Sequence, residues 1–298
     1  EYELAAAALS SLRVDDAPSS PYYQSPAERL EVNVTVAECY LESDAPIDAE
    51  VFVGKAGAAV ADVDGKEHAA LMLRYRSTHA RVLDANRKFL QAAIKYQDLA
   101  NTTNKSVLEG DLLILLGKAV TCTILAPASS QRSLLLSRLS SDPRLPSLDG
   151  LDTFESHGAV VGKMARGELI ASGRMAAFGE SLLPHQKVKN ADGMTIVERA
   201  VLEHNMCAVA RIYASIRFSD LAHLLETTES KAQVIAAKMI TTKVISASVD
   251  QVKGVLRFAE AGGGLGELRA DWEAGVRGFC EGLNEAADGA RAAMEAGK

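Results

Sequence analysis

The sequence predicts a protein dominated by α-helices. An array of helical repeats, similar to tetratricopeptide or HEAT arrays, leads into a winged-helix subdomain with a small β-hairpin and then into a last helix of the kind that joins a bundle. Three observations predict this fold. Amphipathic segments follow one another through the first two thirds of the chain, and residues 215–258 have the order strand, helix, helix, hairpin. The last segment has the apolar spacing of a helix that packs against other helices.

Length and composition agree with this fold class. The chain has 298 residues, of which 48% are hydrophobic, 24% are charged and only 5% are aromatic. Alanine and leucine are abundant, which favours helices, and the length suits more than one domain. The formal net charge is -7, so we expect no general attraction to nucleic acid or to an anionic membrane. The most apolar stretch, 112–126, is too short to span a bilayer.

The N-terminal part contains a series of predicted helices, separated by short breaks with Pro, Gly, Ser or Asp. Their expected ranges are 1–12, 26–41, 47–62, 67–86, 88–99, 107–126, 131–139, 153–166 and 168–182. We assign 1–130 to helical repeats and 131–214 to the helical part of the next domain. The chain begins with Glu1 and not with Met, and its first residues resemble the middle of a helix. We therefore expect the natural N-terminus to lie further upstream.

A weak internal repeat supports the array. Ala5, Ala49 and Ala92 each lie early in a predicted helix, at spacings of 44 and 43 residues. Small residues at matching positions let paired helices approach closely, and this period suits a stacked helix-hairpin solenoid. The alternative is a chance match of alanines in an alanine-rich chain.

The segment 182–260 is the most informative part of the sequence. Its first part, 182–214, has the pattern of one long amphipathic helix. We expect the elements that follow to be a strand at 215–218, helices at 220–226 and 228–242, and β-rich runs at 244–249 and 252–258. This order is typical of a winged helix, a variant of the helix-turn-helix. We assign it to 215–260; such a fold reads nucleic acid or joins subunits.

The predicted C-terminal helix, 264–298, follows a glycine-rich hinge at 261–266. Its apolar residues recur at intervals of three and four, as in the seam of a coiled coil. The residues of this stripe are Leu268, Trp272, Val276, Phe279 and Leu283. A hinged helix can bury such a stripe by folding back or by joining helices of other chains, and the residues themselves leave both alternatives open.

Motifs that carry chemistry are weak in this chain. No Gly-Lys pair is followed by Ser or Thr, so no P-loop is present, and no His-Glu-x-x-His or nucleophile elbow occurs. His204 and Cys207 lie one helical turn apart and could share a metal, but packing explains two such residues better. The four cysteines are far apart, as in a protein of a reducing compartment. We expect no catalytic residue, no cofactor-binding residue and no metal ligand.

Nucleic-acid binding is the main alternative that a winged helix raises. Six basic residues stand against four acidic ones between residues 215 and 258, an excess of only two positive charges. The basic residues are Arg217, Lys231, Lys238, Lys243, Lys253 and Arg257, and the acidic ones are Asp220, Glu226, Glu229 and Asp250. Binding of phosphates normally requires a denser basic face. The candidate recognition helix also contains Val234, Ile235 and Ile240, which suit packing better than groove contacts.

Several segments resemble a known family. They are ECYLESDAPIDAE (38–50), ARVLDANRKFLQAAIKYQDL (80–99), CTILAPASSQRS (122–133), LLPHQ (182–186), ADG (191–193), ERAVLEHN (198–205) and VDQVKGVLRF (249–258). Together with the order of helical repeats, winged helix and last helix, they resemble the PCI-domain family. Members occur in the proteasome lid, in the COP9 signalosome and in translation initiation factor three. Within it the chain is most similar to a PCI subunit of the signalosome.

This resemblance implies a structural role. The signalosome removes the ubiquitin-like protein NEDD-8 from cullins, and its zinc isopeptidase centre lies in a subunit of the MPN type. This chain has no His-x-His pair for such a zinc site. The resemblance therefore implies a non-catalytic scaffold that supports cullin deneddylation and the regulation of cullin-RING ubiquitin ligases, in the cytoplasm and the nucleus. The alternatives are a PCI subunit of the proteasome lid or a winged-helix nucleic-acid-binding protein.

The resemblance also implies partners and contact residues. PCI subunits pair their winged helices edge to edge, which would involve Val249, Asp250, Val252, Val255 and Phe258. Their C-terminal helices gather in a bundle, which favours intermolecular packing of the stripe at 268–283. The implied partners are other PCI subunits, the MPN catalytic pair and cullin-RING ligases. Small molecules, membranes and nucleic acids are not expected partners.

Overall fold

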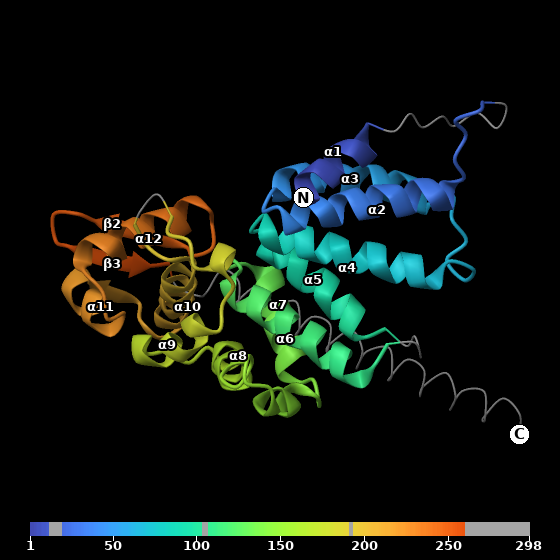
Figure 1. Cartoon of the computed structure of the whole chain (residues 1–298). Coiled ribbons are helices and arrows are strands. Elements are labelled where there is room, and N and C mark those ends of the chain that lie inside the picture. Colours follow the sequence, from blue (N-terminus) through green and yellow to red (C-terminus); the bar gives the residue numbers. More distant parts are fainter. Residues whose placement is uncertain (12–19, 103–106, 191–192, 260–298) are drawn as a thin grey trace, which may run out of the picture. The chain divides into compact units, whose positions relative to one another are not determined.

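The computed structural model describes residues 1–11, 20–102, 107–190 and 193–259 (Figure 1). The chain divides into two compact units, Glu1–Met206 and Cys207–Lys298. The boundary between them falls inside a continuous helix, α10 (Ile196–Ile212). Within the described ranges, no helix combines the length and the apolar character needed to cross a bilayer.

The first unit is helical. Its elements are α1 (Tyr2–Ser10), α2 (Pro26–Glu42), α3 (Pro46–Val60), α4 (Ala69–Ala85), α5 (Phe89–Ala100), α6 (Glu109–Leu125), α7 (Ser130–Ser140), the 3-10 helix η1 (Leu145–Gly150), α8 (His157–Arg166), α9 (Ser172–Glu180), the 3-10 helix η2 (Pro184–Gln186) and the first part of α10. Local sequence signals explain where several of these helices begin. Ser25 forms a capping box with Glu28 at the start of α2, and the Ser129 side chain caps α7.

Helices α2 to α7 form consecutive hairpins, α2 with α3, α4 with α5 and α6 with α7 (Figure 1). Helices α2 and α4 begin at Pro26 and Ala69, which are 43 residues apart. Helices α3 and α5 begin at Pro46 and Phe89, with the same spacing. The predicted repeat array is therefore confirmed.

In the first repeat, the buried alanine lies one position later than expected. Ala49 and Ala92 are fully buried, as expected. In α1, however, the buried alanine is Ala6, whereas Ala5 is exposed. Buried alanines thus recur at two equal intervals of 43 residues. The short side chain at this position leaves room for a neighbouring helix, whereas the adjacent alanine on the other face has no such constraint.

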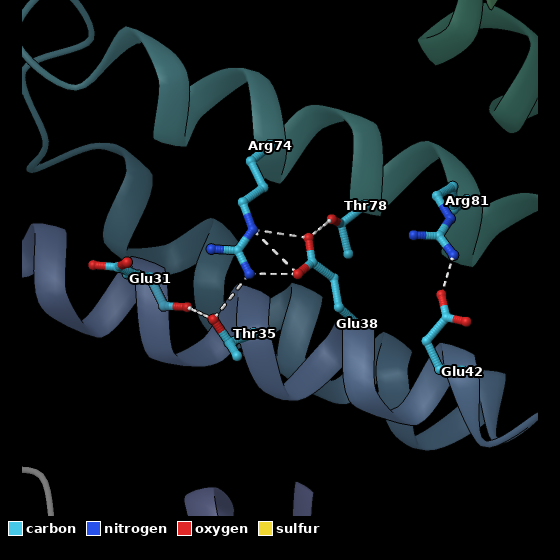
Figure 2. Close-up of polar contacts among 7 residues, drawn as sticks. All are labelled: Glu31, Thr35, Glu38, Glu42, Arg74, Thr78 and Arg81. Carbon is cyan, nitrogen blue, oxygen red and sulfur yellow. Dashed lines mark hydrogen bonds and ion pairs between the residues drawn. The ribbon is translucent and has the colours of Figure 1, made fainter. Parts of the chain in front are cut away.

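Figure 2 shows a row of polar contacts between α2 and α4, the first helices of two successive repeats. The Arg74 Nε atom lies 3.0 and 3.1 Å from the two carboxylate oxygens of Glu38. The Thr78 hydroxyl donates to the same carboxylate at 2.9 Å, and Arg81 pairs with Glu42 at 2.7 Å. Exposed ion pairs contribute little stability. The contacts join Glu38 and Glu42 of α2 to successive turns of α4, at Arg74, Thr78 and Arg81, and this order favours one register of the two helices.

A large hydrophobic core extends from α4 to α10 within the first unit. It combines Leu83 of α4, Tyr96 of α5 and Leu116 of α6 with Phe178 of α9 and Val201 of α10. The last repeats and the helices that follow them therefore share one core.

His157 is a buried titratable residue in this core. Its side chain is 1% exposed and lies between Phe154 and Phe178, at ring-centroid distances of 5.1 and 4.8 Å. Its Nδ1 atom has no hydrogen-bond partner among the described residues. Burial away from water disfavours the charged imidazolium and lowers the pKa of His157 to about 4.

We predict that His157 makes the fold sensitive to acid. In the unfolded chain its pKa is about 6.5, so between about pH 6.5 and pH 4 the unfolded state binds a proton that the folded state does not. Folding stability should fall by up to about 3 kcal/mol as the pH drops through this window, and this histidine should have no effect above it. In urea unfolding at pH 7.5 and 4.5, His157→Phe should lose less stability than the wild type. Equal losses in both proteins would contradict the prediction.

The prediction of one long helix over 182–214 is wrong. The chain forms η2, an antiparallel bridge joins Lys189 to Thr195, and α10 begins only at Ile196. Pro184 has no N–H to donate and keeps Leu183 extended, at ψ 157°. Gly193 has a φ of 72°, which suits a turn and not a helix.

The second unit contains the predicted winged helix. The described elements after α10 are β1 (Ser215–Arg217), α11 (Phe218–Leu224), α12 (Glu229–Thr241), β2 (Ala247–Asp250) and β3 (Val255–Phe258). The strands form an antiparallel sheet in the order β1-β3-β2. Ile216 and Leu256 face each other on its buried side. Both hairpin strands begin three residues later than expected, because Lys243 (φ 58°) and Gly254 (φ 60°) hold the chain in turns.

Candidate protein-interaction surfaces

The five residues predicted for sheet pairing lie in three different environments. Val249 and Asp250 belong to β2, an edge strand among the described strands. Val252 lies in the hairpin turn and is 98% exposed. Val255 and Phe258 belong to β3, which is paired on both sides. The backbone available for a further strand is therefore that of β2 and of β1, and not that of β3.

The register shows which backbone groups point away from the sheet. The N–H of Ala259 donates to the carbonyl of Ser246. Ser248 and Asp250, two and four residues further on, therefore direct their backbone N–H and C=O groups toward β3. Val249 between them directs its N–H and C=O outward. Next to β1, the N–H of Phe258 donates to the carbonyl of Ala214. The backbone N–H and C=O of the following residue, Ser215, therefore point away from β3.

Each edge strand borders a groove. The groove beside β1 has a volume of about 620 Å³, and residues of β1 and α11 line it, among them Arg217, Asp220 and His223. The groove beside β2 has a volume of about 550 Å³ and is lined by apolar Ile240, Ile245 and Phe258, with Lys243 and Arg257. Sequence reasoning missed the β1 edge because the order of strands in a sheet leaves no local signal.

The predicted C-terminal stripe cannot be placed in this way. Its residues, Leu268, Trp272, Val276, Phe279 and Leu283, lie outside the described residues.

The LLPHQ motif anchors the later helices to the repeats. Asp84, at the end of α4, is 4% exposed, and its Oδ1 atom accepts a hydrogen bond from Gln186 Nε2 at 2.9 Å. His185 Nε2 lies 3.2 Å from the same oxygen. The side-chain oxygen of Gln186, Oε1, accepts a hydrogen bond from the backbone N–H of Leu183 at 3.1 Å, which shapes the turn. Because a buried carboxylate requires such partners, this motif has a structural role.

The ERAVLEHN motif has a similar role. Glu203 is 5% exposed and accepts a hydrogen bond from the backbone N–H of Ala128 at 2.9 Å. Asn205 is 3% exposed and binds both the N–H and the C=O of Ile170, each at 2.9 Å. Two side chains of α10 thus complete the hydrogen bonding of loops far away in the sequence.

His204, the candidate metal ligand considered together with Cys207, has a backbone partner. The Nε2 atom of His204 lies 2.9 Å from the backbone carbonyl of Glu168, a hydrogen-bond distance. Among the residues whose placement is described, no group of three or more His, Cys, Asp and Glu side chains could hold a metal ion.

Comparisons with known proteins match both the C-terminal part of the chain and nearly its whole length. The PCI domain family matches residues 181–260. COP9 signalosome complex subunit 4 of Emericella nidulans is 32% identical over 294 residues, which cover 96% of this chain and 68% of that protein. The Arabidopsis thaliana subunit 4 is 34% identical over 88% of this chain, and that of Drosophila melanogaster is 32% identical over 86%.

Helical repeats that lead into a winged helix, together with this match, define a PCI-domain protein. The similarity is also more specific than the domain. The chain belongs to the family of COP9 signalosome complex subunit 4. It spans 64% of the Arabidopsis relative and 59% of the Drosophila relative.

Proposed function

We propose that this chain acts as a non-catalytic scaffold subunit of the COP9 signalosome. The observation that carries the proposal is its similarity to subunit 4 of that complex, at 30 to 34% identity over at least 86% of the chain. The open edges of the winged helix support it, because a strand edge with outward N–H and C=O groups is suited to pairing with a neighbouring sheet.

In this role the chain binds other PCI subunits through the winged helix and the MPN catalytic pair through the assembled complex. It helps to position cullin-RING ligases and couples their arrival to the removal of NEDD-8, in the cytoplasm and the nucleus. The stripe at 268–283 supports a further contact, a bundle of C-terminal helices from several subunits. The chemistry of deneddylation belongs to the MPN partner.

Purification of the tagged full-length protein from its native cells tests the proposal. We expect it to elute with an MPN isopeptidase, other PCI subunits and cullin-deneddylating activity, as shown by sizing, mass spectrometry and an activity assay. Elution alone, with proteasome lid subunits or with nucleic acid would contradict the proposal.

A proline in the outer edge of β2 should block sheet pairing without unfolding the winged helix. Val249→Pro removes an N–H that points away from β3, so the hydrogen bonds of the sheet are retained. We expect at least a tenfold loss of incorporation into the complex, measured by co-purification, with an unchanged circular dichroism spectrum. Val249→Thr retains the N–H and the branched side chain and is the matched control. Equal incorporation of both variants would exclude the β2 edge as a pairing surface.

The C-terminal stripe gives a second test of assembly. Trp272→Asp combined with Phe279→Asp introduces two charges into a surface that we propose to be buried between subunits. We expect the helical repeats to stay folded, with an unchanged thermal midpoint, whereas incorporation into the complex falls sharply. Normal incorporation of the double variant would refute the bundle contact.

A further inference from the structure

The winged helix has a local excess of positive charge, in contrast to the chain as a whole. Residues 207–259 contain seven Lys and Arg against four Asp and Glu, although the chain as a whole has a net charge of -7. Asp250 already pairs with Arg257 at 3.6 Å and accepts a hydrogen bond from the N–H of Lys253. Among the described residues, the remaining basic side chains of this unit form no ion pair, namely Arg211, Arg217, Lys231, Lys238, Lys243 and Lys253.

The first unit contains both kinds of basic residue, since Lys66 and Lys95, for example, form no ion pair with another described residue. There Arg74, Arg81, Lys88, Arg144 and Arg166 each form an ion pair with a carboxylate. A cation without an ion pair can attract an anionic partner without first losing an internal contact.

Helix α12 contains two of these cations beside an exposed apolar side chain. Ala232, Ile235, Ala236 and Met239 are buried and hold the helix on its own unit. The opposite face is exposed, and its residues Ser230, Val234, Ala237 and Thr241 follow one another at intervals of four, three and four. Val234, at the centre of this face, is 47% exposed.

This exposed face has the pattern of one half of a coiled coil. Intervals of four, three and four are those of a seam that packs against a second helix. Lys231 and Lys238 each directly follow a seam residue and so flank the seam on the same side, where charged residues select the partner helix. No acidic residue occurs between Ser230 and Thr241. The small seam residues allow close approach, and the two lysines favour acidic residues opposite them.

We propose that the exposed face of α12 is a docking surface for an acidic amphipathic helix of a partner protein. The surface consists of Ser230, Val234, Ala237 and Thr241, flanked by Lys231 and Lys238. It lies on a helix, so it is distinct from the strand edges of the same unit. The partner helix presents small apolar residues to the seam and Asp or Glu residues beside it.

The spacing of the cations favours a helix over nucleic acid. Lys238 lies seven positions after Lys231, a rise of about 10.5 Å along the helix axis. Acidic residues seven positions apart on a partner helix have the same separation. Double-stranded DNA has one phosphate about every 1.7 Å of its axis and is bound by a much denser row of cations. An exposed valine between the lysines also fits an apolar helix face better than a phosphate backbone.

Site-specific cross-linking in the assembled native complex tests this proposal. The photoreactive residue p-benzoylphenylalanine replaces Val234, and mass spectrometry identifies the peptide that it captures. We expect one main cross-link, to a partner segment that has helical periodicity and a net negative charge. A cross-link to a neutral or basic segment, to nucleic acid or to residues 260–298 of this same chain would overturn the proposal, and so would the absence of a cross-link.

Charge reversal adds a control for general electrostatics. Lys231→Glu with Lys238→Glu should lower the yield of this cross-link about tenfold, because like charges then face each other. Lys66→Glu with Lys95→Glu makes the same change of charge at exposed sites of the first unit and should alter the yield less than about twofold. Reversing the captured acidic residues to lysine should restore the cross-link. Equal effects of the two lysine pairs, or no restoration, would overturn the proposal even if the chain still joins the complex.

Discussion

Replacing Arg132 by methionine is expected to destabilise the first unit by about 3 to 5 kcal/mol. Arg132 is 3% exposed, although it belongs to the short helix α7. Its Nε and Nη2 atoms donate hydrogen bonds to the carbonyls of Thr123 and Ile124, at 3.0 and 2.9 Å. These carbonyls belong to the last turn of α6 and have no partner within that helix. Methionine fills much of the space but leaves both carbonyls buried without a hydrogen bond.

Urea unfolding measures this effect as a lower midpoint with an unchanged slope. Arg138→Met is the matched control, because Arg138 lies on the same helix and is exposed. We expect it to change the free energy of unfolding by less than about 0.5 kcal/mol. Equal effects of the two substitutions would show that Arg132 does not cap α6.

The second large effect is expected for Asn205→Leu, at about 3 to 5 kcal/mol of lost stability. The Asn205 amide accepts from the N–H of Ile170 and donates to its C=O, so it completes both backbone groups of a buried residue. Leucine has a similar volume but satisfies neither group. Each unsatisfied buried group costs about 1 to 3 kcal/mol, which explains why the loss exceeds that of an ordinary hydrogen bond.

Thermal or urea unfolding measures the loss. Asn33→Leu is a useful control, because Asn33 donates only to the carbonyl of Arg29 within its own helix and is partly exposed. We expect it to cost less than about 1 kcal/mol. A loss for Asn205→Leu no larger than that of the control would contradict the anchoring role of the ERAVLEHN motif.

Local signals predicted most of the helices. The predicted helix at 26–41 corresponds to α2 (Pro26–Glu42), because a capping serine and a proline in the first turn define its start. The predicted helix at 182–214 was wrong, because apolar periodicity continued through Pro184 and Gly193 although both residues interrupt a helix. The two strands of the hairpin were predicted to begin too early for a similar reason. The β-branched residues at 244–245 and 252 favour a strand but lie in turns.

The interaction surfaces were only partly predictable. The segment of the winged helix and the residues Val249 and Asp250 at its β2 edge follow from the sequence pattern and the family resemblance. The central position of β3 does not, because hydrogen bonding between strands is a long-range property. The exposed face of α12 became recognisable only when its opposite face was found to be buried.

The sequence by itself determined the helical character, the spacing of the repeats, the winged helix and the family, because periodicity, capping residues and short motifs are local. Only the tertiary structure showed that Gln186 and Asn205 complete distant backbone and carboxylate groups, and that Ala6 occupies the repeat position of Ala49. It also decided which strand edges and which helix face stay open. Burial and hydrogen bonding depend on what packs against a residue, and those neighbours lie far away along the chain.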